Sequence, residues 1–317
     1  MQTMRMCWGS AGIGTDNCRP MPQTPTPSAT DQVTVILVTY NSRTILRETL
    51  PPLRALPHVV VVDNGSSDDT IATVRTLAPN ATIIEAGANL GFGRANNLAL
   101  ERVQTPYALL LNPDCVLPPG TIETVVAAAR RYPDAAILAP KHYDAPGRIG
   151  LAYRPSLWSP QPAGPLAEPD GDLCSEFLTG AVMLLDMQKM RESVGFFDPW
   201  FFLYLEDDDL CLRVRAAGHS LVLVHDAAVE HKVKQSSAPS RRLDFRRAYC
   251  MTLSKFYMQR KYRGLGRCVA TILRIGFGAL FALPLHALRF DGERTTRSAA
   301  RLAAALSAPV RLNARHC

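Results

Sequence analysis

Four consecutive acidic residues, Glu206 to Asp209, follow an aromatic stretch and precede a segment where Leu210, Leu212 and Val214 are interleaved with arginines. Adjacent carboxylates repel one another unless they begin a helix, bind a cation or face solvent, and a helix N-terminus stabilises them. Such a cluster could perform general-base catalysis, in which a carboxylate takes the proton of an attacking hydroxyl group. The alternative is an ordinary acidic first turn of a helix.

A second candidate lies at Asn112-Pro113-Asp114, directly after the apolar run Tyr107–Leu111. Mg²⁺ and Mn²⁺ take oxygen ligands and bridge the oxygens of a diphosphate, and a carboxylate at the end of a strand suits that task. Asp114 is therefore a candidate metal ligand, and a simple turn is the alternative. His231 follows a short apolar run and could join a metal or phosphate site, although a lone histidine is more often structural.

A glycine-containing segment, Asn89 to Asn97, combines Gly91 and Gly93 with the start of an expected helix. Glycines allow close backbone approach, and a helix N-terminus attracts phosphate. The segment differs from the dinucleotide-binding pattern because Asn96 occupies the third glycine position and because it follows the third strand, not the first. This difference weighs against a dehydrogenase.

These residues need a scaffold, and the sequence predicts strands that alternate with helices. Expected strands are 33–39, 59–62, 82–85, 107–111 and 136–139, and the segments between them have helical spacing. Further strands are expected over 177–185, 221–224 and 228–229. This alternation predicts an α/β fold with a doubly wound, mostly parallel sheet. Ligands bind beyond the carboxyl ends of such strands, which here means residues 39–41, 63–66 and 112–114.

The flanking segments differ in composition from this core. Residues 1–31 are rich in proline and polar residues and are expected to form a disordered leader. Residues 145–172 are rich in proline and glycine and are expected to form a long loop that acts as a lid or binds the acceptor. We therefore expect a catalytic domain over 32–235 and a basic helical tail over 236–317.

Charge is distributed unevenly along the chain. From Lys232 to Cys317 there are 18 basic residues against three acidic ones, a net charge of +15, and the remainder carries 17 basic and 25 acidic residues, a net charge of −8. A basic tail favours an anionic partner, either nucleic acid or a membrane surface, unless it is simply a solvated helix. No nucleic-acid-binding motif accompanies it, so no nucleic-acid partner is expected. The eight cysteines form no CxxC pair and no secretory signal is recognised, which predicts a cytosolic, reduced protein.

Within the tail, residues 275–288 form an uncharged stretch of 14 residues between Arg274 and Arg289. A membrane-spanning helix needs about 20 apolar residues, and Pro284 is expected to kink this one. With basic clusters on both sides, the stretch is expected to lie in the headgroup region of an anionic membrane and not to span it. A helix packed on the catalytic domain is the alternative.

Taken in order, five segments resemble the family-2 glycosyltransferases, specifically their rhamnosyltransferase-like branch. They are Val35–Asn41, Val62–Asp68, Asn89–Asn97, Leu110–Asp114, and Gly195–Asp198 through Glu206–Arg213. The resemblance implies the GT-A fold, a Rossmann-like α/β architecture, and inverting transfer of a sugar from a nucleoside diphosphate to an acceptor hydroxyl. It also implies Mg²⁺ or Mn²⁺ as the cofactor.

The resemblance further implies a role for each matching residue. The nucleotide-sugar site would comprise Thr39, Tyr40, Asn41, Asp63, Gly91, Gly93, Arg94, Asn97 and Asn112. Asp114 and His231 would bind the metal, with Asn112 in place of the first Asp of the family's DxD-type motif. Asp207 would be the base and Glu206 its partner, while Asp208, at a position that is often apolar in this branch, leaves that choice open.

For substrates, the branch implies dTDP-L-rhamnose as donor and a lipid-linked or polysaccharide acceptor in cell-envelope glycan synthesis. The enzyme would then be cytoplasmic and peripheral on the inner face of the cell membrane. The alternatives are another donor such as UDP-galactofuranose, or a non-catalytic sugar-nucleotide-binding protein.

Overall fold

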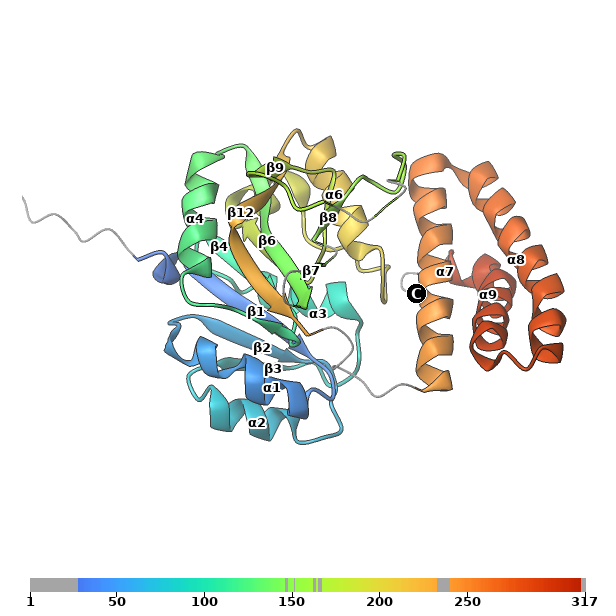
Figure 1. Ribbon diagram of the computed structural model, residues 1–317, viewed down its shortest axis with the longest axis horizontal. Helices are drawn as coiled ribbons and strands as arrows, with labels where there is room; N and C mark the ends of the chain where they lie inside the picture. Colours follow the sequence, from blue (N-terminus) through green and yellow to red (C-terminus); the bar gives the residue numbers. More distant parts are fainter. Residues whose placement is uncertain are drawn as a thin grey trace, which may run out of the picture.

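The computed structural model describes residues 28–145, 148–150, 152–161, 164, 167–232 and 240–314 (Figure 1). All but the last four residues of the predicted leader lie outside this part of the chain. The described chain forms an α/β body followed by three long helices, which pack side by side next to it.

A mixed sheet forms the centre of the body, in the order β3-β2-β1-β4-β11-β6-β12-β5. Its strands are β1 (Val33–Thr39), β2 (Val59–Asp63), β3 (Thr82–Glu85), β4 (Tyr107–Leu111), β5 (Cys115–Val116), β6 (Ala135–Ala145), β11 (Val182–Asp186) and β12 (Ser220–His231). The ladders joining β1, β2, β3 and β4 are parallel, as is that between β6 and β12, whereas β11 runs antiparallel to both β4 and β6. The short strands β7 (Arg148–Ile149) and β9 (Leu173–Cys174) pair at its margins.

Helices cover both faces of the sheet, as the alternating pattern predicts. They are α1 (Arg43–Thr49), α2 (Thr70–Leu77), α3 (Phe92–Leu100), α4 (Thr121–Arg131) and α6 (Glu206–Ala216). Successive residues of β1 point to opposite faces, so that Val35 and Leu37 pack in one hydrophobic core and Ile36 in the other. The expected α/β architecture is confirmed.

Two predicted strand segments differ in detail. The single strand expected over 177–185 is divided into β10 (Phe177–Leu178) and β11, with Gly180 in the break. β10 instead pairs with β8 (Tyr153–Arg154), a strand from the loop predicted over 145–172. Conversely, the two short strands expected after residue 220 are one strand, β12, with an irregularity between Val224 and Ala228.

The tail forms α7 (Arg241–Arg263), α8 (Leu265–Leu288) and α9 (Gly292–Arg311). α7 faces the body, and α8 lies at the far edge of the molecule (Figure 1). The α7 side chain of Tyr257 stacks on Trp200, with ring centroids 3.9 Å apart, and Phe256 is buried with Phe201 in a third hydrophobic core. The segment before α6 is therefore the surface on which the helices dock.

The apolar element of the tail is longer in the structure than the 14 residues expected from the sequence. α8 has 24 residues, includes Arg267 and Arg274, and continues past Pro284 to its end. By length and composition it is long and apolar enough to cross a membrane, with a mean hydropathy of 1.9 in its best window, of which 11% is buried. The sequence estimate failed because it ended the stretch at Arg274, whereas a helix of this length accommodates two arginines.

Asp209 anchors the helices to the body. Its carboxylate is fully buried and accepts hydrogen bonds from Arg213 Nε at 2.9 Å, Lys261 Nζ at 2.5 Å and Tyr262 Oη at 2.8 Å. Arg213 lies on α6, while Lys261 and Tyr262 lie on α7. One carboxylate of the acidic quartet is thus committed to joining two helices.

We expect Asp209→Ala to lower the free energy of unfolding by about 3 kcal/mol, the lower end of the range for breaking a buried ion pair, because both cations retain some solvent contact. Urea denaturation followed by circular dichroism would measure this loss. The matched control is Asp69→Ala, which removes an exposed ion pair with Arg43 and should cost less than about 1 kcal/mol. Equal losses in the two variants would contradict the anchoring role.

Candidate active site

The carboxyl ends of β1 and β2 lie side by side, with Thr39 and Asp63 paired in register. Asp63 accepts a hydrogen bond from the Ser66 N–H through Oδ2, and its buried Oδ1 has no partner among the described residues. Asn41 adopts a left-handed conformation (φ 50°) and donates its N–H to Ser66 Oγ, and Tyr40 is exposed. The structure thus brings these four predicted nucleotide-site residues to one edge.

Three other predicted donor-site residues support the chain instead of facing a free surface. Gly91 has φ 88°, and a Cβ there would lie 2.0 Å from the Phe202 carbonyl oxygen; a Cβ on Gly93 would lie 2.8 Å from the Cβ of Phe197. Asn97 binds both backbone groups of Phe197, donating to its oxygen at 2.8 Å and accepting from its N–H at 3.1 Å. These residues hold the 197–202 segment against α3.

Arg94 and Asn112 differ from those three because their side chains are available to contact a ligand. Both are half-buried, and within the described part of the chain no polar contact of either side chain is recorded. The Asn112 N–H donates to the Ala181 oxygen at 2.8 Å and its oxygen accepts from the Cys115 N–H, so the Asn-Pro-Asp turn is held by its backbone.

At this turn, Asp114 meets His231 and a residue that sequence reasoning missed, Asp144. His231 Nε2 lies 3.5 Å from Asp114 Oδ1, and its Nδ1 lies 3.5 Å from Asp144 Oδ1. Both carboxylate oxygens are buried and have no hydrogen-bond partner in the described chain. Asp114 Oδ1 and a ring nitrogen of His231 are close enough to share a divalent cation such as Mn²⁺ or Mg²⁺, whereas Asp144 contacts the opposite ring nitrogen and orients the imidazole.

The side chains around this cluster differ in their protonation. Cys115 Sγ lies close to Asp114 and His231, but burial and then the Asp114 charge raise the pKa of the thiol well above its usual range, so it keeps its proton. Burial lowers the pKa of His142 to about 3, so its ring is neutral. His231 differs because the Asp114 carboxylate, 3.5 Å away, raises its pKa.

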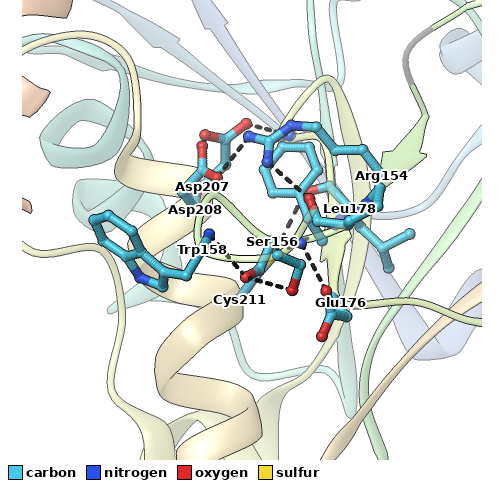
Figure 2. Close-up of polar contacts among 12 residues, drawn as sticks. Arg154, Ser156, Trp158, Glu176, Leu178, Asp207, Asp208 and Cys211 are labelled. Carbon is cyan, nitrogen blue, oxygen red and sulfur yellow. Dashed lines mark hydrogen bonds and ion pairs between the residues drawn. The ribbon is translucent and has the colours of Figure 1, made fainter. Parts of the chain in front are cut away.

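The four acids at the start of α6 have different environments. Asp209 is the anchor described above, and Asp208 is buried in an ion pair with Arg154 at 2.5 Å (Figure 2). The Arg154 guanidinium also lies over the Phe177 ring at 3.7 Å. Burial, and then the Asp207 charge, raise the pKa of Glu206 to about 8. Burial, and then the Asp207 charge, also raise the pKa of Asp208, to about 7 despite its pairing with Arg154, so Glu206 has the higher pKa and is the first to retain a proton.

Asp207 is the most accessible of the four, half-buried while the other three are buried. Its Oδ2 accepts the Gly180 N–H at 3.1 Å and its Oδ1 accepts the Asp208 N–H at 3.0 Å. Each oxygen keeps a further lone pair. Burial raises the pKa of Asp207, which brings a carboxylate closer to the range that suits a general base.

The break between β10 and β11 joins the two chemical centres. The Gly180 N–H holds Asp207, and the carbonyl of the next residue, Ala181, accepts the N–H of Asn112 in the Asp114 turn. Residues far apart in sequence are therefore set relative to one another by the backbone of two consecutive residues.

The acids are preceded by two non-glycine residues in the left-handed region, Tyr204 (φ 72°) and Leu205 (φ 66°). Such conformations cost on the order of 1 kcal/mol or more each and persist only where the surroundings impose them. Here the surroundings are α3 on one side and α7 on the other. The strained pair directs the first turn of α6, and its acids, toward Gly180.

Sequence reasoning missed Arg154, Asp144 and Gly180. Arg154 and Asp144 lie in or next to the loop predicted over 145–172, which was recognised as functional only as a whole. Gly180 lies inside what was expected to be a continuous strand. A glycine within a strand pattern often marks a break or a close approach, and that signal was available.

The similarity of this chain to known proteins covers residues of the site just described. The family model of glycosyl transferase family 2 matches residues 34–185, which include Thr39, Asp63, Asp114 and Gly180. The chain is a glycosyltransferase with a family-2 domain. Its sequence is 29% identical over 246 residues to an N-acetylglucosaminyl-diphospho-decaprenol L-rhamnosyltransferase of Mycobacterium tuberculosis, covering 66% of this chain and 78% of the relative.

Other similarities concern more distant glycosyltransferases. A low-salt glycan biosynthesis hexosyltransferase of Haloferax volcanii is 25% identical over 248 residues, covering 71% of this chain and 77% of that protein. Among solved structures, a mannosyltransferase from Pyrobaculum calidifontis in complex with GDP-Man and Mn²⁺ has a TM-score of 0.54 at 18% identity and covers 92% of this chain and 91% of its own. The S. aureus TarS structure in complex with UDP has a TM-score of 0.52 at 16% identity, covering 86% and 92%. The predicted GT-A fold is confirmed.

A pH experiment tests the protonated state of this glycosyltransferase's Glu206. An ordinary glutamate has a pKa near 4.5, against about 8 here. Below about pH 4.5 Glu206 is neutral in both states; from there to about pH 8 unfolding releases its proton, so the free energy of unfolding falls as pH rises. We expect Glu206→Gln to remove this dependence.

Urea denaturation of wild type and Glu206→Gln at pH 5 and pH 8 measures the effect. The variant should gain stability relative to wild type on going from pH 5 to pH 8, and this difference cancels any constant effect of the amide. Glu123→Gln, an exposed acid in the first turn of α4, is the control. If Glu206→Gln and Glu123→Gln show the same pH dependence, Glu206 is ionised in the folded protein.

Proposed function

We propose that this glycosyltransferase moves a sugar, with inversion, from a nucleoside diphosphate donor to a hydroxyl group of a lipid-linked acceptor. L-Rhamnose from dTDP-L-rhamnose is the proposed donor, supported by the name of the mycobacterial relative. A lipid diphosphate is the proposed carrier of the acceptor sugar, on the same support. The resulting glycan would belong to the cell envelope.

The accessibility of Asp207 carries this proposal. Among the four acids of α6, Asp208 and Asp209 are held by cations and Glu206 is protonated, so Asp207 is the carboxylate free to accept a proton. Its two backbone hydrogen bonds hold it in one orientation. A positioned base of this kind is what an attacking hydroxyl group needs.

In the proposed reaction, the acceptor oxygen attacks the anomeric carbon from the side opposite the diphosphate. The acceptor O–H proton passes to Asp207 as the new C–O bond forms, and the bond from the anomeric carbon to the diphosphate oxygen breaks. The electron pair of that bond leaves with the nucleoside diphosphate. Glu206, Asp208 and Arg154 position Asp207 and do not exchange protons with the acceptor.

Asp114 and His231 would hold the metal ion, Mg²⁺ or Mn²⁺, in this proposal, and Asp144 would orient the His231 ring. When bound, such an ion stabilises the negative charge of the leaving diphosphate. The support is the buried Asp114 Oδ1, which has no hydrogen-bond partner among the described residues and lies beside the imidazole. Asp63, also with a buried free oxygen, would contact the base of the nucleotide, and Thr39, Tyr40 and Asn41 would line its site.

We also propose that the enzyme is cytoplasmic and docks on the inner face of the cell membrane through α8. The apolar α8 face is a stripe of exposed side chains at helical spacing, comprising Leu265, Val269, Leu273, Phe277, Leu280, Phe281, Leu285 and Leu288. Basic residues on either side suit an anionic surface. Among the described residues, three of the tail's cations form ion pairs within the protein: Lys261 binds Asp198 and Asp209, Arg294 pairs with Asp291, and Arg297 pairs with Glu293.

The donor and acceptor can be tested with purified full-length protein. We expect dTDP-L-rhamnose to give the fastest nucleotide release in a panel that includes UDP-galactofuranose, and release to rise when a lipid-diphosphate-linked sugar is added. Asp207→Asn should reduce turnover at least about a hundredfold, the scale of general-base catalysis, with donor affinity retained.

Asp208→Asn is the matched control, because it makes the same carboxylate-to-amide change at the neighbouring acid. Its turnover should stay well above that of Asp207→Asn, since Asp208 only supports Arg154. The reverse order, with Asp208→Asn inactive and Asp207→Asn near wild type, would make Asp208 the base. If no donor in the panel gave nucleotide release, the proposed function would be wrong.

A separate measurement tests the metal site. Asp114→Ala should weaken donor binding in the presence of Mn²⁺ by at least about tenfold, because a charged ligand is lost, while acceptor binding is nearly unchanged. Isothermal titration calorimetry with and without chelator gives both affinities. Full activity after exhaustive chelation would remove the metal from the mechanism.

A further inference from the structure

The three C-terminal helices enclose two adjoining hollows of about 410 and 390 Å³. Thr252, Lys255 and Arg301 line both. The first hollow is also lined by Arg247 and Arg297 and the second by Arg274, so five basic side chains from α7, α8 and α9 converge on one region. We call these five residues and the two hollows the basic pocket.

Positive charge in the basic pocket is not balanced by the surrounding acids. No ion pair of Arg247, Lys255, Arg274 or Arg301 is recorded within the described ranges. Asp244 is the acid that lines the first hollow, and the fifth basic residue, Arg297, already pairs with Glu293. The arrangement leaves several uncompensated cations in one concave site.

The pKa of Lys255 reflects the closeness of these positive charges. Burial first, and then the charges of Arg301 and Arg274, lower its pKa. Its side chain lines an open hollow, and Lys255 is an exposed residue, as are Arg274 and Arg301. An anion bound between Lys255 and Arg301 would relieve the repulsion, and phosphate groups bind such cations through charge-assisted hydrogen bonds.

The surroundings of the basic pocket indicate what kind of anion fits. On one side, α8 contributes Ile275 and Ala279 to the second hollow, while the apolar α8 face, centred near Leu273 and Phe277, points to the opposite side of that helix. On the other side, the first hollow reaches Tyr204, two residues before Glu206. The cluster of cations therefore lies next to the segment that carries the catalytic acids.

We propose that the basic pocket binds the diphosphate group of a lipid-linked acceptor, with Lys255 and Arg301 at its centre. This inference rests on the proposed function for the lipid nature of the acceptor. The two adjoining hollows share Lys255 and Arg301, and each has at least one further cation, which suits two linked phosphates.

Binding of farnesyl diphosphate to the full-length protein tests the proposal directly. The titration is done by calorimetry with chelator present and no donor, so that metal-dependent binding at the donor site is excluded. Lys255→Gln and Arg301→Gln should each weaken binding at least about tenfold, the loss expected for a charge-assisted contact. Lys255→Arg should keep most of the affinity because it keeps the charge.

The matched control is Arg267→Gln, which removes one positive charge from an exposed site on α8 outside both hollows. It should change affinity by less than about twofold. An equal loss in Arg267→Gln would mean diffuse electrostatic attraction and overturn the proposal. Binding of farnesol as tight as that of farnesyl diphosphate would also overturn it, because the diphosphate would then contribute nothing.

Two further outcomes identify the wrong site or the wrong lipid. If Asp114→Ala weakens farnesyl diphosphate binding as much as Lys255→Gln does, the diphosphate occupies the donor site. If phosphatidylglycerol vesicles compete fully at equal phosphate concentration, the pocket binds bulk membrane lipid. The assay needs neither donor nor turnover, so absence of glycosyl transfer with intact, Lys255-dependent binding would count against the proposed function alone.

Discussion

Two backbone groups of consecutive residues, the Gly180 N–H and the Ala181 carbonyl, set the geometry on which the candidate active site depends. The first donates to Asp207 and the second accepts the N–H of Asn112. Backbone groups are good reference points because they have no rotamers to average over. The space around them is tight, since a Cβ on Gly180 would lie 3.3 Å from the Phe92 ring and 3.4 Å from Asp207. A larger residue at Gly180 would push Asp207 and helix α3, which carries Phe92, away from each other.

The acidic quartet shows how one sequence motif is divided among several tasks. Identical or similar carboxylates become an anchor, an ion-pair partner, a neutral acid and a free base because each meets a different set of neighbours. Removing two of the four charges by cation pairing and a third by protonation also reduces the mutual repulsion that a quartet would otherwise carry. The helix N-terminus stabilises what charge remains.

Much of this arrangement could be predicted from sequence because it follows from local periodicity. β-Branched runs gave the parallel strands, and the rule that ligands bind at the carboxyl ends of strands brought Thr39, Asp63 and Asp114 to one edge. Long-range partners could not be predicted in the same way. Asp144 and Arg154 reach the site through pairings of β6 with β12 and β8 with β10, and no pattern in the sequence specifies those contacts.

The glycines after β3 show a different limitation. Their spacing correctly indicated a close approach, but sequence alone could not tell whether a phosphate or another part of the chain approaches. In the structure it is the Phe202 carbonyl that lies against Gly91. Likewise, the division of Glu206, Asp207 and Asp208 into distinct roles required knowledge of Arg154, so composition alone left the choice between them open.

The left-handed pair Tyr204 and Leu205 has a consequence for how this enzyme would respond to selection in the laboratory. Glycine adopts positive φ without steric penalty, so substitutions there would relax the backbone and allow the first turn of α6 more freedom. A screen that rewards heat tolerance alone would favour such relaxed variants, whereas a screen that rewards product formation would retain the bulky pair. Directed evolution toward the two goals would therefore diverge at these two positions.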